Sequence, residues 1–343
     1  MEYPSLDKPT AGAFRFNTDS SNLEIYDGNQ WTGVQSGLTP ELQTGGTRAL
    51  YCLGNEGPGS GTNRSNRIEY INISTTGNGV DFGDATERLR AGPFALSSRT
   101  RALMGGGQNP GFSDTINYVT ITQPANAADF GNLVSTGRQF VGGSNQTRGL
   151  IWGYGAPACN VMQYMTIATT GNAVDFGDIA SGSAASGAAY GDKTRSVYAG
   201  GYASTVVQYA NIATTGNSSN FGDMLNPNKV YVTAGAGNAV RGLMFGGNQM
   251  APAAGTKIDT IAYNTYSTLG DQIDFGNLDV ARWSTAAAST ATRAVCMGGY
   301  SPANRDNKMQ YVNIATTGDP TDFGDLTTER SDGSGCSNGH GGL

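Results

Sequence analysis

Residues 148–178 read RGLIWGYGAPACNVMQYMTIATTGNAVDFGD, and the same order of features recurs six times along the chain. An arginine opens an apolar run that ends in glycine. A segment of alternating polarity around a tyrosine follows, and a turn (Thr169-Thr-Gly in this copy) then leads to an Asp-Phe-Gly unit, in which Asn220 replaces Asp in the fourth copy. The alternation predicts half-buried strands, and the turn residues predict tight connections between them. With a small-residue strand before the next arginine, each copy predicts four strands.

The spacing inside the copies is nearly constant. In every copy the tyrosine lies 12 residues before the phenylalanine (82 − 70 = 12 in the first copy). The repeated residues are Arg48, Arg101, Arg148, Arg195, Arg241 and Arg293; Tyr70, Tyr118, Tyr164, Tyr209, Tyr263 and Tyr311; and Phe82, Phe130, Phe176, Phe221, Phe275 and Phe323. Copies recur every 45 to 54 residues (221 − 176 and 275 − 221), which is the spacing of propeller blades.

This order of strands resembles the kelch-type β-propeller over about residues 47–340. Phe stands where kelch repeats usually carry an outer-strand Trp, so the chain is kelch-like rather than a typical member. The resemblance implies an all-β, six-bladed propeller with four-stranded blades, and it implies no function.

Composition agrees with this fold and excludes other classes. Glycine accounts for 51 of 343 residues, about twice the usual ~7%, and the net charge of −6 offers no basic surface for nucleic acid. No apolar run approaches the roughly 18 residues of a membrane span. We therefore expect neither nucleic acid nor a membrane among the partners.

The ends of the propeller are predicted to meet. The chain enters the first blade at its second strand (47–53), and residues 331–338 match the small-residue strand that is missing there. We expect the C-terminal strand to close blade one and to place Cys336 near Cys52. A disulfide or two packed thiols would both fit, and cytosolic folding favours the thiols.

The blades differ mainly between their second and third strands, where the connections vary in length. Such variation gathers on one face of a repeat array, often the binding face. The N-terminal segment enters at the opposite face. The candidate ligand-binding residues in the variable connections are Arg64, Arg67, Phe112, Tyr154, Tyr202, Tyr300 and Arg305. Aromatic rings there suit sugars or protein partners, although ordinary turn composition explains any single residue as well.

Residues 1–36 lie outside the repeat and predict a small β-meander, too short to form its own core. Its apolar residues must bury against the propeller, a sister chain or another protein; they are Phe14, Phe16, Leu23, Ile25 and Trp31. The order Gly12-x-x-Arg15-x-Asn17-Thr18, followed by Leu23-Glu24-x-Tyr26-Asp27-Gly28-x-x-Trp31, resembles a β module of tail-fibre and other virion proteins of tailed bacteriophages. The resemblance implies attachment to other virion proteins, and by analogy a homotrimer.

Catalytic and metal chemistry find little support in the sequence. His340 is the one histidine, so neither a serine–histidine triad nor a multi-histidine metal centre can form. Acids flank the Asp-Phe-Gly units, as in Asp81 and Asp84. Calcium binding is one reading of them, but salt bridges or turn hydrogen bonds with the repeat arginines are simpler. A glycosidase using carboxylates alone stays open as a third choice.

We therefore expect residues 1–36 to attach a propeller, residues 37–343, to a phage virion that is assembled in the host cytoplasm. The expected role is non-enzymatic adhesion, as a tail fibre or tail-associated adhesin that binds host surface glycan or protein, with no cofactor or metal. The alternative is a structural virion component without receptor binding, such as a capsid decoration or tail nozzle protein.

Overall fold

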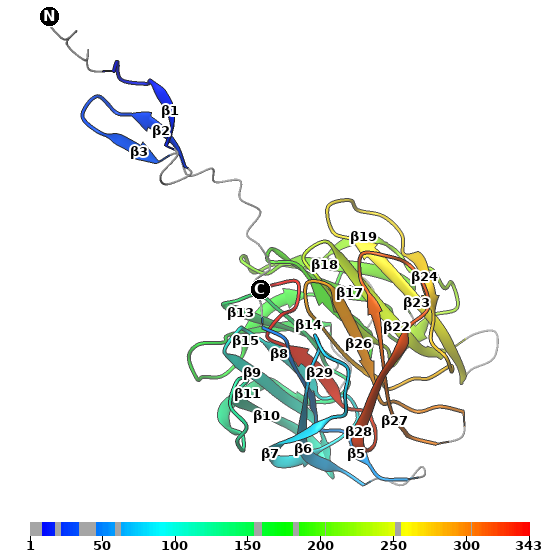
Figure 1. Cartoon of the computed structure of the whole chain (residues 1–343). Helices are drawn as coiled ribbons and strands as arrows, with labels where there is room; N and C mark the ends of the chain where they lie inside the picture. Colours follow the sequence, from blue (N-terminus) through cyan, green and yellow to red (C-terminus); the bar gives the residue numbers. More distant parts are fainter. Residues whose placement is uncertain are drawn as a thin grey trace, which may run out of the picture. The chain divides into compact units, whose positions relative to one another are not determined.

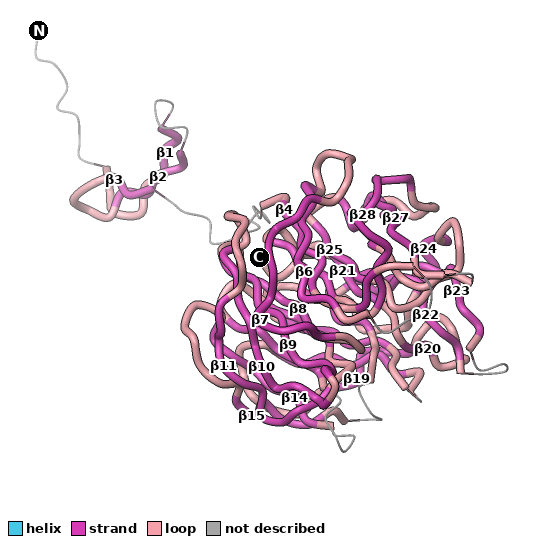
Figure 2. Tube along the Cα trace, turned by 90° about the horizontal axis from the view of Figure 1, so that it is seen from below, coloured by secondary structure: helices cyan, strands magenta, loops and turns pink. Residues whose placement is uncertain are grey.

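The computed structural model describes residues 9–17, 22–33, 46–58, 63–153, 160–180, 185–202, 204–250, 255–302 and 304–343. Across these residues the regular structure is β-strand throughout, without a helix (Figures 1 and 2). The all-β class predicted from the sequence is therefore confirmed. The chain divides into two compact units, Met1–Leu42 and Gln43–Leu343, and the expected boundary at residues 36 and 37 lies outside the described residues.

The small unit is a three-stranded antiparallel sheet in the order β1 (Phe14–Asn17), β2 (Asn22–Tyr26) and β3 (Trp31–Gly33). The β2–β3 turn forms because the Asp27 carboxylate accepts hydrogen bonds from the N–H groups of Asn29 (2.7 Å) and Gln30 (2.8 Å). The predicted meander is present.

The large unit contains six antiparallel sheets among its described residues. Sheet 1 is β29 (Ser334–Ser337), β4 (Arg48–Cys52), β6 (Ser65–Asn72) and β7 (Val80–Leu89). Sheet 2 is β8 (Phe94–Ser97), β9 (Arg101–Asn109), β10 (Gly111–Thr120) and β11 (Ala128–Gly137). Sheet 3 is β12 (Val141–Ser144), β13 (Arg148–Trp152), β14 (Val161–Thr166) and β15 (Val174–Asp178).

The other three sheets repeat the pattern. Sheet 4 is β16 (Ala188–Gly191), β17 (Arg195–Ala199), β18 (Val206–Asn211) and β19 (Ser219–Asp223). Sheet 5 is β21 (Ala234–Gly237), β22 (Arg241–Gln249), β23 (Thr256–Thr265) and β24 (Ile273–Asn277), with β20 (Val230–Tyr231) also paired to β22. Sheet 6 is β25 (Ala286–Ser289), β26 (Arg293–Met297), β27 (Asp306–Asn313), β28 (Thr321–Ser331) and β5 (Asn55–Glu56).

The last strand of the chain pairs with the first strand of the large unit. β29 runs antiparallel to β4, with Cys336 opposite Leu50 and Ser334 opposite Cys52. The expected pairing of residues 331–338 with residues 47–53 is thus present in sheet 1. We call the strand that begins each of the six sheets as given above its first strand. The six first strands contact one another in a ring, from β29 to β8, β12, β16, β21 and β25 and back to β29.

The repeated arginine, tyrosine and phenylalanine form one stack in each sheet. In sheet 1 the buried Phe82 ring meets the edge of Tyr70 (6.0 Å between centroids), and the Arg48 guanidinium lies 4.5 Å above that tyrosine. The same contacts recur in the other sheets, with ring distances of 5.8–6.0 Å and guanidinium distances of 4.5–5.6 Å. The constant 12-residue spacing is therefore explained by an aromatic pair worth about 0.5–1.5 kcal/mol beyond its buried area.

These stacks also join neighbouring sheets. Arg148 of sheet 3 donates to the backbone carbonyls of Ile212 (3.0 Å) and Ala213 (3.0 Å) in sheet 4. The Phe176 carbonyl accepts a hydrogen bond from the Gly216 N–H (2.8 Å) in the turn of that same sheet. Gly77 closes the series by donating to the Phe323 carbonyl (2.8 Å), which links sheet 1 to sheet 6. The expected pairing of the repeat arginines with the flanking carboxylates is wrong, because the guanidinium groups donate to backbone carbonyls in the turn of the neighbouring sheet; these arginines are Arg48, Arg101, Arg148, Arg241 and Arg293.

Three of the four cysteines are described, and all three are free thiols buried in the large unit: Cys52, Cys296 and Cys336. A hydrogen bond with Cys336 and burial both raise the pKa of Cys52. Of the two arrangements left open by the sequence, the structure has packed thiols. Cys159 lies outside the described residues.

Candidate functional site at the loop end

The connections between second and third strands lie at one end of the large unit, which we call the loop end. In sheet 2 the β9–β10 connection joins Asn109 to Gly111, whereas Arg101 at the other end of β9 pairs with Thr120. The chain enters the large unit at the arginine end, where the Gly46 N–H donates to the Asn338 carbonyl (2.6 Å). Within residues 46–343, entry and variable connections are therefore at opposite ends, as the strand order predicts.

Three of the predicted aromatic residues lie at the loop end, where Tyr202 and Phe112 are exposed and Tyr300 is half-buried. Tyr202 is 52% exposed and meets Tyr231 edge-to-face (5.7 Å between centroids). Tyr300 meets Trp283 in the same way (6.0 Å). Phe112 is 36% exposed, and the Arg138 guanidinium lies 5.5 Å from its ring centroid. Tyr154 lies outside the described residues.

The predicted arginines separate into two environments. Arg64 and Arg67 line a groove of about 530 Å³ together with Arg88, which the sequence analysis did not select. Arg305 is 5% exposed instead, and it donates to the Ser331 hydroxyl (3.1 Å) and the Gly57 carbonyl (2.9 Å). Arg305 thus joins the β27 and β5 segments inside the protein, and we leave it out of the candidate site.

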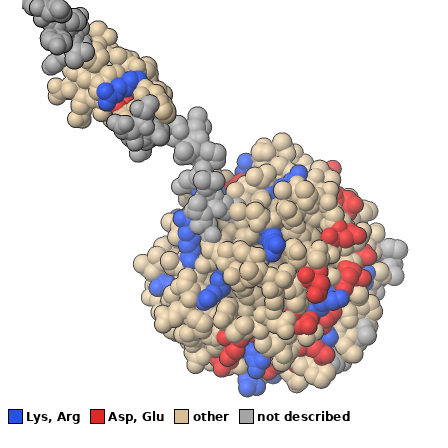
Figure 3. Space-filling model, in the orientation of Figure 1, with Lys and Arg blue, Asp and Glu red and all other residues tan. Residues whose placement is uncertain are grey.

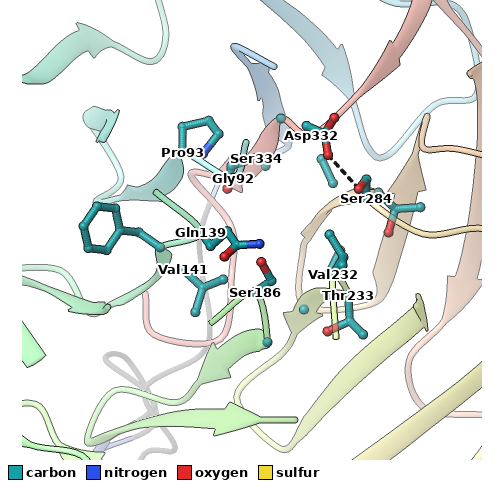
Figure 4. Close-up of a pocket in the computed structure, with 18 of the residues that line it drawn as sticks. Gly92, Pro93, Gln139, Val141, Ser186, Val232, Thr233, Ser284, Asp332 and Ser334 are labelled. Atoms are coloured by element: carbon teal, nitrogen blue, oxygen red, sulfur yellow. Dashed lines mark hydrogen bonds between the residues drawn. The ribbon is translucent and has the colours of Figure 1, made fainter. Parts of the chain in front are cut away.

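A cavity of about 310 Å³ opens between the first strands near the loop end (Figure 4). It is lined by the residues that precede the first strand of each of the six sheets. Two of its lining residues, Tyr231 and Trp283, are the partners of Tyr202 and Tyr300. The cavity and the predicted tyrosines therefore belong to one site.

Six lining residues occupy equivalent positions, two residues before the start of each first strand, and all have a left-handed backbone. We call them the collar: Gly92 (φ 74°), Gln139 (61°), Ser186 (57°), Val232 (56°), Ser284 (54°) and Asp332 (57°). Only one of them is glycine, in a chain with 51 glycines. A left-handed residue with a side chain costs about 1–2 kcal/mol, and the cost is greatest for the β-branched Val232.

The left-handed backbone allows the collar to form a closed circuit of hydrogen bonds. Each N–H donates to the sheet before it: Ser186 to Gln139 (3.1 Å), Val232 to Ser186, Ser284 to Val232 (2.9 Å), Asp332 to Ser284 (3.1 Å) and Gly92 to Asp332 (3.3 Å). Between sheets 2 and 3, Gln139 donates to Ala91 (2.9 Å) and Phe140 to Gly92 (3.0 Å). Glycine would satisfy this backbone at every position, so the backbone circuit does not explain why side chains are present there.

The collar side chains are chemically varied. The Asp332 carboxylate is held by the Ser284 hydroxyl (2.7 Å) on Oδ1 and by the Asn55 amide (2.7 Å) and the Ser331 hydroxyl (3.3 Å) on Oδ2. Figure 4 shows Gln139 and Ser186 extending into the cavity opposite this pair. Next to Val232, the hydroxyl of the buried Thr233 has no hydrogen-bond partner in the structure. The cavity thus presents an acceptor, an amide and hydroxyls to a ligand.

The opposite end of the same channel is filled by residues 339–343. The His340 Nε2–H donates to the Ser97 carbonyl (2.9 Å), and its Nδ1 accepts the Gly342 N–H (3.1 Å). The Gly341 N–H donates to the Gly237 carbonyl (3.0 Å) of sheet 5. Burial lowers the pKa of His340 to about 4, so the ring is neutral at pH 7. The remaining space at this end is about 50 Å³, and the larger cavity is consequently closed below.

No protein-family model matches the chain, and a search of curated proteins finds no match. The part of the chain that the structure describes has no helix long and apolar enough to cross a membrane. In the same residues, no group of three His, Cys, Asp or Glu side chains is arranged to hold a metal ion. The function must therefore be argued from the site itself.

Proposed function

We propose that the large unit is a six-bladed, kelch-like β-propeller whose blades are the six sheets. The repeat spacing supports this assignment, as do the circuit of contacts among the first strands and the pairing of β29 with β4. A closed array leaves only short edges that are protected inside the ring, which is the advantage of propeller architecture.

We further propose that the protein is a non-enzymatic adhesin of a tailed-phage virion that binds host surface glycan or protein through the loop end. The observation that carries the binding role is the 310 Å³ cavity with the exposed Tyr202 and the half-buried Tyr300 beside its lining. Ligand pockets typically measure about 300–1,000 Å³ and combine apolar walls with a few placed polar groups. The face drawn in Figure 3 is mostly uncharged, with acidic side chains gathered on its right side. Among the described residues that line the cavity only Arg90 and Asp332 are charged, which favours recognition by shape and hydrogen bonds.

A binding role fits the cavity better than glycan cleavage. Glycosidases use two carboxyl groups that flank the scissile bond. Asp332 is the one acidic residue among those lining the cavity, and both of its oxygens already accept hydrogen bonds from neighbouring side chains.

Attachment is assigned to the small unit. Phe14 and Phe16 on β1 are each 63% exposed, and their register partners Ile25 and Leu23 share their face of the sheet. An apolar face of this kind in a unit without a core calls for a partner, and the tail-fibre resemblance of residues 12–31 indicates another virion protein. The same face is the observation that favours the alternative, a structural virion component without a receptor.

The test is binding of the purified full-length protein to host cells and to an array of bacterial surface polysaccharides. We expect binding that weakens at least fivefold in Tyr202→Ala and Tyr300→Ala. Val240→Ala is the matched control, because Val240 is 57% exposed beside Arg241, at the arginine end. Binding to purified phage particles but to no cell or polysaccharide would support the structural role and reject adhesion.

A further inference from the structure

We propose that the cavity behind the collar binds the terminal residue of an uncharged glycan, and not a residue within the glycan chain. This inference rests on the proposed binding function and names the ligand for the same site. It depends on three features of the cavity: its size, its closed lower end and the side chains retained on the collar.

The size of the cavity suits one or two sugar rings. Its volume is about 310 Å³, and a cavity of about 150 Å³ holds one benzene-sized ring. A longer oligosaccharide would have to continue outward. The exposed Tyr202, which contacts the lining residue Tyr231, offers its ring to those next sugars. Tyr300, which contacts Trp283, is half-buried with the Lys257 Nζ 5.1 Å from its ring centroid, and offers the exposed part of its ring.

Because its lower end is closed, the cavity can admit only the terminal residue of a glycan chain. A polymer can place an internal residue in a channel only if the chain leaves at both sides. Residues 339–343 block the lower side, because His340 bonds to sheet 2 through Ser97 and Gly341 bonds to sheet 5 through Gly237. A ligand therefore enters and leaves through the same opening, and only its end reaches the collar.

The polar groups suit an uncharged polyol. The fixed Asp332 carboxylate has lone pairs left to accept sugar hydroxyls, and it repels acidic sugars. The Gln139 amide both donates and accepts, and the Ser186 hydroxyl extends into the same space. Arg90 also lines the cavity, and its charge opposes cationic ligands.

The retained side chains are the strongest argument for a ligand. Five collar residues keep side chains at φ values of 54–61°, where glycine avoids the strain. Strained residues of this kind cluster at ligand sites because the side chain is needed there. Here they lie around one cavity, one before the first strand of each of sheets 1, 3, 4, 5 and 6, and they carry an amide, two hydroxyls and a carboxylate.

The first experiment tests recognition of ends with defined probes. Methyl glycosides of glucose, galactose and mannose are titrated into the full-length protein by saturation-transfer NMR. The neutral polysaccharide retained best on the array is then compared before and after partial hydrolysis, at equal mass. We expect at least one methyl glycoside to bind and to displace the polysaccharide, and binding per mass to rise in proportion to the number of chain ends.

The second experiment tests the collar with matched variants. We expect Gln139→Gly and Asp332→Asn to weaken glycan binding about tenfold or more, which corresponds to the loss of one charge-assisted or bidentate hydrogen bond. Lys229→Gly is the control, because Lys229 has a similar left-handed backbone (φ 53°) but does not line the cavity. It should leave binding unchanged, while thermal unfolding shows that all three variants fold.

The outcomes separate the two proposals. The terminal-residue inference is wrong if binding per mass of polysaccharide does not change when partial hydrolysis increases the number of chain ends. It is also wrong if the folded collar variants bind like the parent protein. In either case adhesion through another part of the loop end stands. If no glycan, cell or methyl glycoside binds at all, both proposals fail.

Discussion

Protonation of His340 is expected to unfold the closed end of the channel, and the size of the effect follows from the structure. The ring is mostly buried, its Nε2–H bonds to the Ser97 carbonyl and its Nδ1 accepts the Gly342 N–H, so a second ring proton would break a hydrogen bond. Burial lowers the pKa of His340 from 6.5 to about 4. Because the unfolded chain takes up the proton first, stability is fully present above about pH 6.5 and is lost as the pH falls toward 4.

With a pKa of 6.5 in the unfolded chain and about 4 in the folded protein, proton uptake by His340 lowers the free energy of unfolding by at most about 2 kcal/mol between about pH 7 and pH 5. Urea unfolding at a series of pH values measures this loss. His340→Gln is the control, since an amide keeps one donor and one acceptor but does not titrate. Its unfolding free energy should stay flat over the same interval.

His340 is the one histidine of the chain, so its NMR titration gives its pKa without assignment. A measured pKa of 6 or above would refute the reasoning, as would equal pH dependence in the parent protein and His340→Gln. Either result would mean that the ring is open to water and that the channel is not closed there.

Three further predictions test other parts of the fold. Deletion of residues 331–343 removes β29 from β4 and should abolish cooperative thermal unfolding, whereas an unchanged Tm would contradict the closure of sheet 1. Gly131→Ala places a Cβ 2.5 Å from the Gly171 carbonyl oxygen of the next sheet and should cost about 2 kcal/mol or more in urea unfolding. Gly171→Ala should cost less, because it shares the positive φ (159°, against 146° at Gly131) but its Cβ meets nothing within 4 Å. In a Cys159→Ser background the native protein should react with a thiol reagent only on unfolding, because burial raises the pKa of Cys296 to about 11 and the pKa of Cys52 is also raised; rapid native labelling would show these thiols to be accessible.

The repeat could be predicted because the same residue types recur at the same spacing in every copy. Tyr70 and Phe82 pair in sheet 1 as their constant spacing implies, and residues 331–338 were matched to the missing strand by composition alone. Hydrogen bonds from side chains to backbone carbonyls cannot be predicted in this way, because every residue has a backbone carbonyl. The repeat arginines suggested carboxylates because charge is visible in a sequence, whereas the carbonyls of Ile212 and Ala213 are not.

The collar was missed for a related reason. Its positions share a backbone angle and not a residue type, so Gln139, Val232 and Asp332 give no common signal. Arg305, in contrast, was predicted to bind a ligand at the surface but is buried. It stands in a variable connection, but the extension of β28 to Ser331 and its pairing with β5 bury the side chain. Only long-range pairing decides which loop residues reach the surface.

The meeting of β29 with β4 has a consequence for how the chain is made. The Arg48 N–H bonds to the Asn338 side chain (3.0 Å) across 290 residues, so β4 leaves the ribosome long before its neighbour is translated. At about 5–20 residues per second the delay is roughly 15–60 s. During that time β4 can pair with β6 but keeps its other edge unpaired, and we expect the yield in cells to depend on chaperones that cover that edge until translation ends.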